Sequence, residues 1–197
     1  MMKQTISLGG AWRMHACGSD QWHDAQVPGS VYADLMADGT MPDPFYRDNE
    51  MDALKLMDND FYYSRTFAVG EELLNSDAVI LRCEGLDTLA TLYINGDVVG
   101  IANNMHRIWE YDVKKALQVG ENTIEVRFAS PTKYIKEAYE KSVADGSSDA
   151  MVGFPHIRKA HCMFGWDWGP RLPDAGIWRD IDLLGINVAR IRDVHVL

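Results

Sequence analysis

The pair Asn95-Gly96 lies between two apolar runs, residues 88–94 and 97–99, and it constrains the fold more than any other feature of the sequence. A two-residue hairpin turn of type I′ needs positive φ angles at both central positions, and asparagine and glycine adopt them readily. The sequence therefore predicts a tight β-hairpin here, with its two strands paired in antiparallel fashion.

Alternating apolar and polar residues predict several further short strands. They cover residues 61–67, 78–83, 123–129, 177–183 and 189–196. In the third of these strands, Ile124, Val126 and Phe128 share one face, because successive side chains of a strand point to opposite sides. That face is expected to lie in the core.

The first residues form another alternating segment, which Gly9-Gly10 interrupts. This pattern indicates an edge strand with a bulge or a sharp bend, and the strand is expected to join a sheet. Its apolar positions are Ile6, Leu8, Trp12 and Met14.

Only two helices are predicted, and both are short. Ser30 is suited to cap a helix that ends near Asp38-Gly39, and Ser130-Pro131 supplies a cap and an N1 proline for a second helix over residues 133–142. The buried side of the first helix is expected to carry Val31, Leu35 and Met36. Residues 41–50 have no period and many polar side chains, so a loop is predicted there. Many short strands with few helices indicate an all-β fold, an antiparallel β-sandwich.

The charge of the chain excludes several classes of partner. It has 29 acidic and 19 basic residues and a formal net charge of −10, which would repel a nucleic-acid backbone and an anionic membrane surface. The first residues lack the apolar stretch of a signal peptide, and no apolar run is long enough to span a bilayer. A cytoplasmic chain is therefore expected.

The cysteines and histidines do not indicate a metal site or a redox site. Cys17, Cys83 and Cys162 are widely spaced and are expected to be free thiols. His156, His161 and Cys162 come nearest to a ligand cluster, but their spacing matches no zinc pattern. The sequence therefore predicts no metal and no cofactor.

Residues 164–179 are rich in tryptophan, aspartate and arginine and are punctuated by glycine and proline. Trp166, Asp167 and Trp168 combine two chemistries that suit a sugar. An indole can lie against the C–H face of a pyranose ring, and a carboxylate can accept hydrogen bonds from the ring hydroxyls. The flanking glycines and Pro170 favour a turn, in which the three side chains can converge on one ligand. A buried structural corner has the same composition, so both interpretations stay open.

Several short motifs are distributed along nearly the whole chain. They are Leu8-Gly9-Gly10-Ala11-Trp12, Val27-Pro28-Gly29-Ser30, Asp43-Pro44-Phe45-Tyr46 with Asn49-Glu50, Gly85-Leu86-Asp87-Thr88, Tyr93-Ile94-Asn95-Gly96 and Gly120-Glu121-Asn122. Together they resemble the N-terminal sugar-binding domain of glycoside hydrolase family 2. The segments 155–160, 164–171 and 176–179 are similar to the β-mannosidase branch of that family, because β-galactosidases and β-glucuronidases carry a different loop in place of the Trp-Asp-Trp segment.

The resemblance implies a jelly-roll sandwich, similar to galactose-binding domains, over residues 1–187 of a retaining exo-β-mannosidase. Residues 188–197 would be its final strand or the start of an immunoglobulin-like domain, with a catalytic (β/α)8 barrel beyond it. By the same resemblance, Trp166, Asp167 and Trp168 bind the substrate as one wall of a pocket for terminal non-reducing β-D-mannose. The catalytic glutamates belong to the barrel, so no catalytic residue and no hydrolytic activity are expected in this chain alone.

Other interpretations stay open. Asn49-Glu50 superficially resembles the Asn-Glu pair that precedes a catalytic acid in such barrels, but it follows a proline-rich loop, so a structural or site-edge role is expected. A stand-alone carbohydrate-binding module could stack a sugar on Trp12, Trp22 or Trp109. Exo-β-glucosaminidases of the same family carry a similar Trp-Asp-Trp segment. A domain that serves only to dock onto a barrel through apolar surface is a further alternative.

Overall fold

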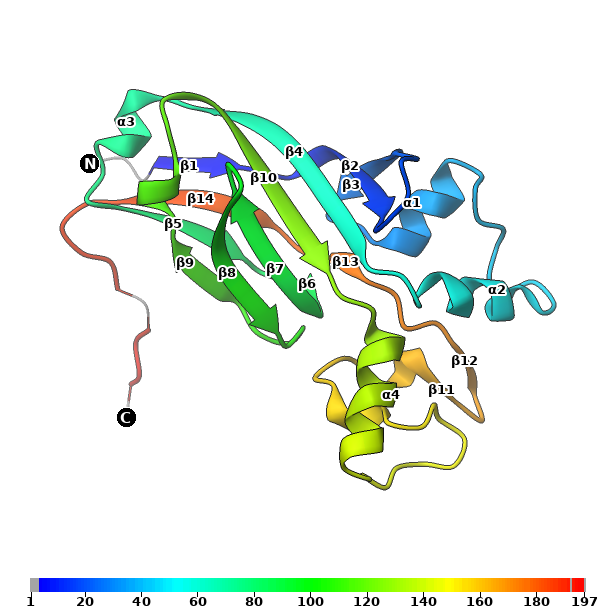
Figure 1. Ribbon diagram of the computed structural model, residues 1–197. Coiled ribbons are helices and arrows are strands. Elements are labelled where there is room, and N and C mark those ends of the chain that lie inside the picture. The colour runs from blue at the N-terminus through cyan, green and yellow to red at the C-terminus, as the bar shows by residue number, and fades with distance from the viewer. Residues whose placement is uncertain (1–3, 192, 197) are drawn as a thin grey trace.

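The computed structural model describes residues 4–191 and 193–196. Two antiparallel sheets enclose the main hydrophobic core between them (Figure 1). The larger sheet has the strand order β3-β2-β4-β10-β7-β8, and the smaller has the order β1-β14-β5-β9. The strands are β1 Gln4–Ser7, β2 Gly10–Ala16, β3 His23–Val27, β4 Phe61–Val69, β5 Ala78–Cys83, β7 Leu89–Ile94, β8 Asp97–Asn103, β9 Trp109–Asp112, β10 Gly120–Phe128 and β14 Ile181–Ile186. The predicted antiparallel β-sandwich is confirmed.

The predicted hairpin is formed by β7 and β8, with Ile94 paired to Asp97 across the turn. Asn95 and Gly96 have φ angles of 52° and 88°, the signs that a type I′ turn requires. The Asn95 side chain also donates a hydrogen bond of 2.9 Å to the Ala116 carbonyl, which ties the turn to the neighbouring loop. The Asn95-Gly96 pattern therefore predicted this hairpin correctly.

The other strands largely follow the predicted segments, and Ile124, Val126 and Phe128 of β10 are buried as expected. The N-terminal segment differs, because it contains two strands that belong to different sheets. Gly10, with a φ angle of 101°, lies at this crossing. β1 is an edge strand as predicted. The edge prediction is wrong for β2, because β3 pairs with one side of it and β4 with the other.

The C-terminal strands are shorter than predicted. The segment 177–183 is divided between β13, Gly176–Ile177, and β14, because residues 178–180 leave the ladder. β13 pairs with β6, Leu86–Asp87. Among residues 189–191 and 193–196, which the structure describes, no strand is formed, so that strand prediction is wrong. An alternating sequence needs a partner strand for its backbone groups, and none is paired with it here. A further domain beginning at residue 188 stays a prediction.

Both predicted helices are present. α1 spans Val31–Ala37 and α4 spans Pro131–Lys141. Ser30 and Ser130 cap them, each accepting a hydrogen bond from the backbone amide three residues later. Met36 is 40% exposed, so its predicted burial is wrong. The buried residues of α1 are Val31, Tyr32, Asp34 and Leu35.

Two further α-helices, α2 over Asn49–Leu56 and α3 over Glu71–Leu74, were not predicted. The start of α2 overlaps the predicted loop, which is therefore wrong for Asn49 and Glu50. Asp48 precedes α2 without a side-chain capping bond, and only Ala53 of the helix is buried. The helix α2 thus has neither a side-chain cap nor a buried apolar stripe, although aspartate is a favoured residue at the cap position. The short 3-10 helices are η1 Lys114–Ala116, η2 Phe154–His156 and η3 His161–Met163.

A smaller cluster lies beside one end of the sandwich, where α4 packs next to a short hairpin of β11, Phe164–Trp166, and β12, Gly169–Arg171 (Figure 1). It has its own hydrophobic core. The buried members are Ile135, Ala150, Phe154, Ile157 and Phe164. The predicted sugar-binding residues therefore lie on this subsidiary cluster, outside the sandwich core.

Candidate functional site

Trp166, Asp167 and Trp168 form the tip of the β11–β12 hairpin, here called the Trp-Asp-Trp corner. Trp166 pairs with Gly169 in the ladder, so Asp167 and Trp168 occupy the turn. The indoles of Trp166 and Trp168 are 37% and 69% exposed and stack with centroids 4.8 Å apart and planes inclined by 25°. The corner therefore faces solvent and is not sealed inside the sandwich.

Asp167 is exposed, and within the described part of the chain its carboxylate makes no hydrogen bond and no ion pair. A brace for a loop would be expected to accept hydrogen bonds from neighbouring amides. A free carboxylate beside two stacked indoles can instead accept hydrogen bonds from sugar hydroxyls while an indole covers the apolar face of the ring. The turn that the flanking glycines and Pro170 favour is present in the structure.

The hairpin is held at its base by buried and hydrogen-bonded residues. Phe164 is fully buried, and its carbonyl accepts a hydrogen bond of 2.9 Å from the Met151 amide. Gly165 has a φ angle of 86°, and a Cβ atom there would lie 2.6 Å from Cγ of Arg171. Glycine is therefore needed at this position, because a side chain would displace Arg171.

Glu50 of α2 links the hairpin to the rest of the chain. Its Oε1 atom accepts a hydrogen bond of 2.8 Å from the backbone amide of Arg171 in β12. The pattern Asn49-Glu50 suggested a catalytic acid only superficially, and the structure places Glu50 as a brace beneath the Trp-Asp-Trp corner. Sequence spacing could not reveal this contact, because the two residues are 121 positions apart.

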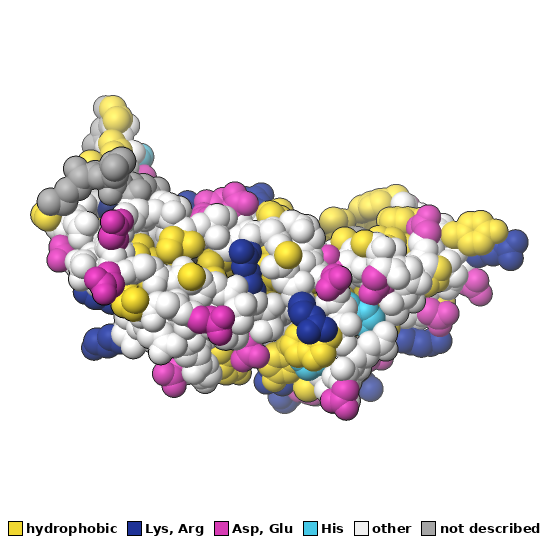
Figure 2. All heavy atoms as spheres, turned by 90° about the horizontal axis from the view of Figure 1, so that it is seen from above, with side chains coloured by type: hydrophobic (Ala, Val, Ile, Leu, Met, Phe, Trp, Pro, Cys, Tyr) yellow, Lys and Arg dark blue, Asp and Glu magenta, His cyan; other side chains and the backbone are white. Residues whose placement is uncertain are grey.

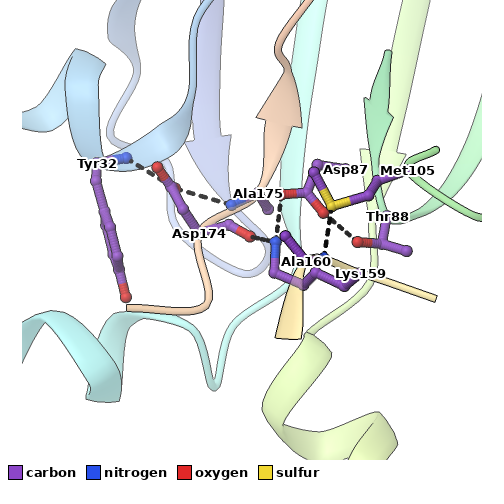
Figure 3. Close-up of polar contacts among 8 residues, drawn as sticks. All are labelled: Tyr32, Asp87, Thr88, Met105, Lys159, Ala160, Asp174 and Ala175. Carbon is purple, nitrogen blue, oxygen red and sulfur yellow. Dashed lines mark hydrogen bonds and ion pairs between the residues drawn. The ribbon is translucent and has the colours of Figure 1, made fainter. Parts of the chain in front are cut away.

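A largely buried polar network joins the segments on either side of the hairpin to the sandwich (Figure 3). Lys159 is 2% exposed, and its ammonium group pairs with the carboxylate of Asp87 and donates a hydrogen bond of 2.7 Å to the carbonyl of Asp174. Burial lowers the pKa of Lys159, and the neighbouring Asp87 carboxylate opposes that shift. The pair joins β6 of the sandwich to the segment that leads into the hairpin.

Asp174 extends this network to α1. Its carboxylate accepts hydrogen bonds from the amides of Tyr32, at 3.1 Å, and Ala175, at 2.8 Å (Figure 3). Burial raises the pKa of this carboxyl group from 3.8 to about 6, although these hydrogen bonds oppose the shift. Asp87 and Lys159 are buried, and Asp174 is half-buried. These three residues, called the polar triad below, were not singled out from the sequence, because burial is a property of the tertiary structure.

Trp12, Trp22 and Trp109, the tryptophans considered for a stand-alone module, do not provide the platform that it would need. Trp12 is 3% exposed and donates its indole N–H to the Leu8 carbonyl at 2.7 Å. Trp22 lies beneath the Arg13 guanidinium, and Trp109, which is on the other sheet from Trp12, stacks on Tyr111. Trp22 is 39% exposed, but the Arg13 guanidinium lies over it and Trp12 is buried, so the three indoles do not form one exposed platform.

Exposed apolar side chains also lie at the end of the molecule that carries α2 (Figure 2). Phe45, Tyr46 and Met51 are all more than half exposed. Because α2 contacts β12, this apolar surface is close to the hairpin that carries the corner. Large exposed apolar residues near one another are typical of an interaction surface.

The cysteines are free thiols, and Cys17 and Cys162 are exposed. Within residues 4–191 and 193–196, no group of three or more histidine, cysteine, aspartate or glutamate side chains could hold a metal ion. In the same part of the chain, no helix has the length and apolar character needed to cross a membrane.

Residues 12–179 match the family described as glycosyl hydrolase 2 galactose-binding domain-like. The β-mannosidase of Bos taurus is 33% identical over 199 residues, which cover 95% of this chain and 22% of the relative. The β-mannosidase B of Aspergillus terreus is 36% identical over 86% of this chain and 20% of the relative. The chain therefore spans about a fifth of the length of the curated relatives it matches.

Comparison with solved structures agrees with the family match and the sequence relatives. The crystal structure of the β-D-mannosidase from Dictyoglomus thermophilum superposes with a TM-score of 0.92 and 39% identity, over 96% of this chain and 23% of that chain. The exo-chitosanase of Amycolatopsis orientalis gives a TM-score of 0.66 at 16% identity, over 91% of this chain and 20% of that chain. At this low identity, the likeness to the exo-chitosanase shows only that the two proteins share a fold.

Proposed function

Because this chain belongs to the galactose-binding-like domain family of glycosyl hydrolase 2, we propose that it is the N-terminal domain of a retaining exo-β-mannosidase. The complete protein would hydrolyse terminal non-reducing β-D-mannose from β-mannosides. In this proposal the Trp-Asp-Trp corner forms one wall of the mannose pocket, and a catalytic (β/α)8 barrel outside this chain forms the rest.

The observation that carries the proposal is the open carboxylate of Asp167 beside the stacked indoles of Trp166 and Trp168. Asp167 accepts hydrogen bonds from mannose hydroxyls, and the indoles cover the apolar face of the ring. The exposed apolar surface around Phe45, Tyr46 and Met51 supports a domain that docks against further polypeptide, since such surface is unfavourable in water.

The proposed division of labour follows from the chemistry of glycoside hydrolysis. A retaining enzyme needs two carboxyl groups about 5 to 5.5 Å apart, one as the nucleophile and the other as the acid. The proposal assigns both to the barrel. The 197-residue chain alone should therefore not hydrolyse aryl β-mannosides, and it should bind free mannose weakly, because half a pocket buries too little of the ligand.

The proposal is tested in the longer protein that includes the barrel. We expect Asp167→Ala to lower kcat/KM for an aryl β-mannoside by the equivalent of about 2 to 4 kcal/mol, provided that the hydrogen bond tightens in the transition state. Asp97→Ala, at another exposed hairpin turn, is the matched control and should leave the rate unchanged. An unaltered rate in the Asp167 variant would reduce the corner to a structural role.

A second assay separates the two glycosidase alternatives. The longer protein should hydrolyse aryl β-mannosides faster than aryl β-glucosaminides. The reverse preference would leave the assignment of this domain unchanged, but the proposed substrate would then be a β-glucosaminide. Calorimetry on the 197-residue chain tests whether the chain is instead a stand-alone sugar-binding domain. Tight mannose binding without the barrel would contradict the proposal that the chain forms only half of the pocket.

The cytoplasmic location stays a prediction, which cell fractionation checks.

A further inference from the structure

A separate polar hollow of about 600 Å3 lies beside the segment that leads into β11. One wall is the turn after β8, with Asn104 and His106, and the other is the segment 155–161. The two walls are fixed to each other, because Asn104 and Arg158 form a parallel bridge and the Met105 amide donates a hydrogen bond of 3.0 Å to the Arg158 carbonyl. The hollow is therefore part of the folded domain.

The lining of this hollow is basic in an acidic chain. Acidic residues outnumber basic ones by 29 to 19 in the whole chain, yet neither aspartate nor glutamate lines the hollow. Its titratable lining residues are His106, His156, Arg158, Lys159 and His161. This distribution of charge favours a negatively charged ligand.

Several of these groups have no polar partner within the described part of the chain. The exposed side chains of Arg158 and His106 make neither a hydrogen bond nor an ion pair there. Nε2 of His156 is covered by protein and also lacks a partner. Lys159 is different, because Asp87 already neutralises its ammonium group. The available charge of the hollow therefore comes from Arg158, with imidazoles around it.

We propose that this hollow binds a carboxylate, with the Arg158 guanidinium as the main donor and His106 as a second one. A guanidinium matches the two oxygens of a carboxylate in a bidentate geometry, which makes this pairing stronger than a neutral hydrogen bond. The carboxylate belongs either to a side chain in further polypeptide of the same protein or to a small free acid. Only the first of these sources depends on the proposed function.

The first arm of the test uses the 197-residue chain and sodium acetate at constant ionic strength, with sodium chloride as the reference salt. We expect saturable changes in the NMR shifts of the His106, His156 and His161 imidazoles. His15 and His23 lie on β2 and β3, away from the hollow, and should not change. The absence of a saturable change at the three hollow histidines would overturn the proposal.

Matched variants separate the site from general charge. Arg158→Gln should weaken acetate binding about tenfold, because it removes a charge-assisted hydrogen bond. Lys115→Gln removes one positive charge from an exposed position away from the hollow and should leave binding unchanged. Equal weakening in both variants would also overturn the proposal. His106→Gln gives an independent second variant if Arg158→Gln fails to fold.

The second arm repeats the acetate titration in the longer protein. If a side chain from further polypeptide fills the hollow, acetate no longer shifts the three histidines, and Arg158→Gln lowers the melting temperature more than Lys115→Gln does. If the ligand is a free acid, acetate shifts the histidines in both proteins. Neither result depends on hydrolysis of mannosides, so this proposal and the proposed function can fail separately.

Discussion

Two members of the polar triad, Lys159 and Asp174, flank the Trp-Asp-Trp corner in the chain, yet the triad and the corner treat polar groups in opposite ways. Lys159 is buried and Asp174 is half-buried, and each has a partner inside the fold. Asp167 and Trp168 are exposed, and the Asp167 carboxylate is free of partners among the described residues. The difference separates residues that hold this segment in place from residues that are available to a ligand.

The free energy of burial explains why the polar triad and the Trp-Asp-Trp corner differ. A charge buried without a partner is strongly unfavourable, so Lys159 has to be paired with Asp87. A large indole left 69% exposed gains little from folding, so Trp168 has no evident structural reason to be there. Substitutions should therefore affect stability at the triad and recognition at the corner.

The largest expected effect comes from breaking the triad. Lys159→Met leaves the Asp87 carboxylate buried without its partner and should lower the free energy of unfolding by about 3 to 5 kcal/mol. Lys136→Met, on the exposed side of α4, is the matched control and should be close to neutral. Urea denaturation followed by circular dichroism measures both. A similar small effect for the two variants would show that the triad does not anchor the segment.

The next effect concerns Asp174 and pH. In the folded chain its pKa is raised from 3.8 to about 6 by burial, so between these values the folded state binds more protons than the unfolded state. The free energy of unfolding should therefore fall as pH rises from about 4 to 6, by up to about 3 kcal/mol relative to Asp174→Asn.

Urea denaturation of the parent chain and Asp174→Asn at several pH values measures this difference. Asp180→Asn changes an exposed carboxyl group nearby and serves as the control. Parallel pH profiles for the parent chain and Asp174→Asn would contradict the shifted pKa.

A smaller effect on stability is expected at the hydrogen bond between Glu50 and Arg171, which links α2 to the hairpin that carries the corner. Glu50→Ala removes the acceptor for the Arg171 amide and should lower the free energy of unfolding by about 0.5 to 1.5 kcal/mol. It should also weaken the exciton signal in circular dichroism that the stacked indoles of Trp166 and Trp168 produce. Glu50→Gln keeps an acceptor oxygen and should restore both. If the two variants behave alike, the hydrogen bond does not position the corner.

The smallest effect on stability is expected at the corner itself. Trp168→Ala should change the free energy of unfolding by no more than about 0.5 kcal/mol, because the side chain is largely in water. Trp12→Ala, which empties a buried site in the sandwich, should cost about 3 to 5 kcal/mol. Thermal and urea denaturation compare the two variants. A large loss of stability in Trp168→Ala would make the corner structural.

Strands were predicted well where local sequence carries the physical cause. Alternation of apolar residues located β4, β5 and β10, and Asn95-Gly96 located the β7–β8 turn because positive φ angles are a local requirement. Alternation failed for residues 189–191 and 193–196, which the structure describes, since a strand also needs a partner for its backbone groups. Helix α2 was missed because it lacks both a capping bond and a buried stripe.

The sequence by itself determined the sandwich class, the hairpin turn, the two capped helices and the segment that carries Trp166, Asp167 and Trp168, because each depends on neighbours in the chain. The tertiary structure alone decided that Asp167 is open, that Glu50 braces Arg171 and that Lys159 is buried against Asp87. The last two features depend on contacts between residues that are 121 and 72 positions apart in the chain. Burial and pairing over such separations follow from packing, which no local pattern encodes.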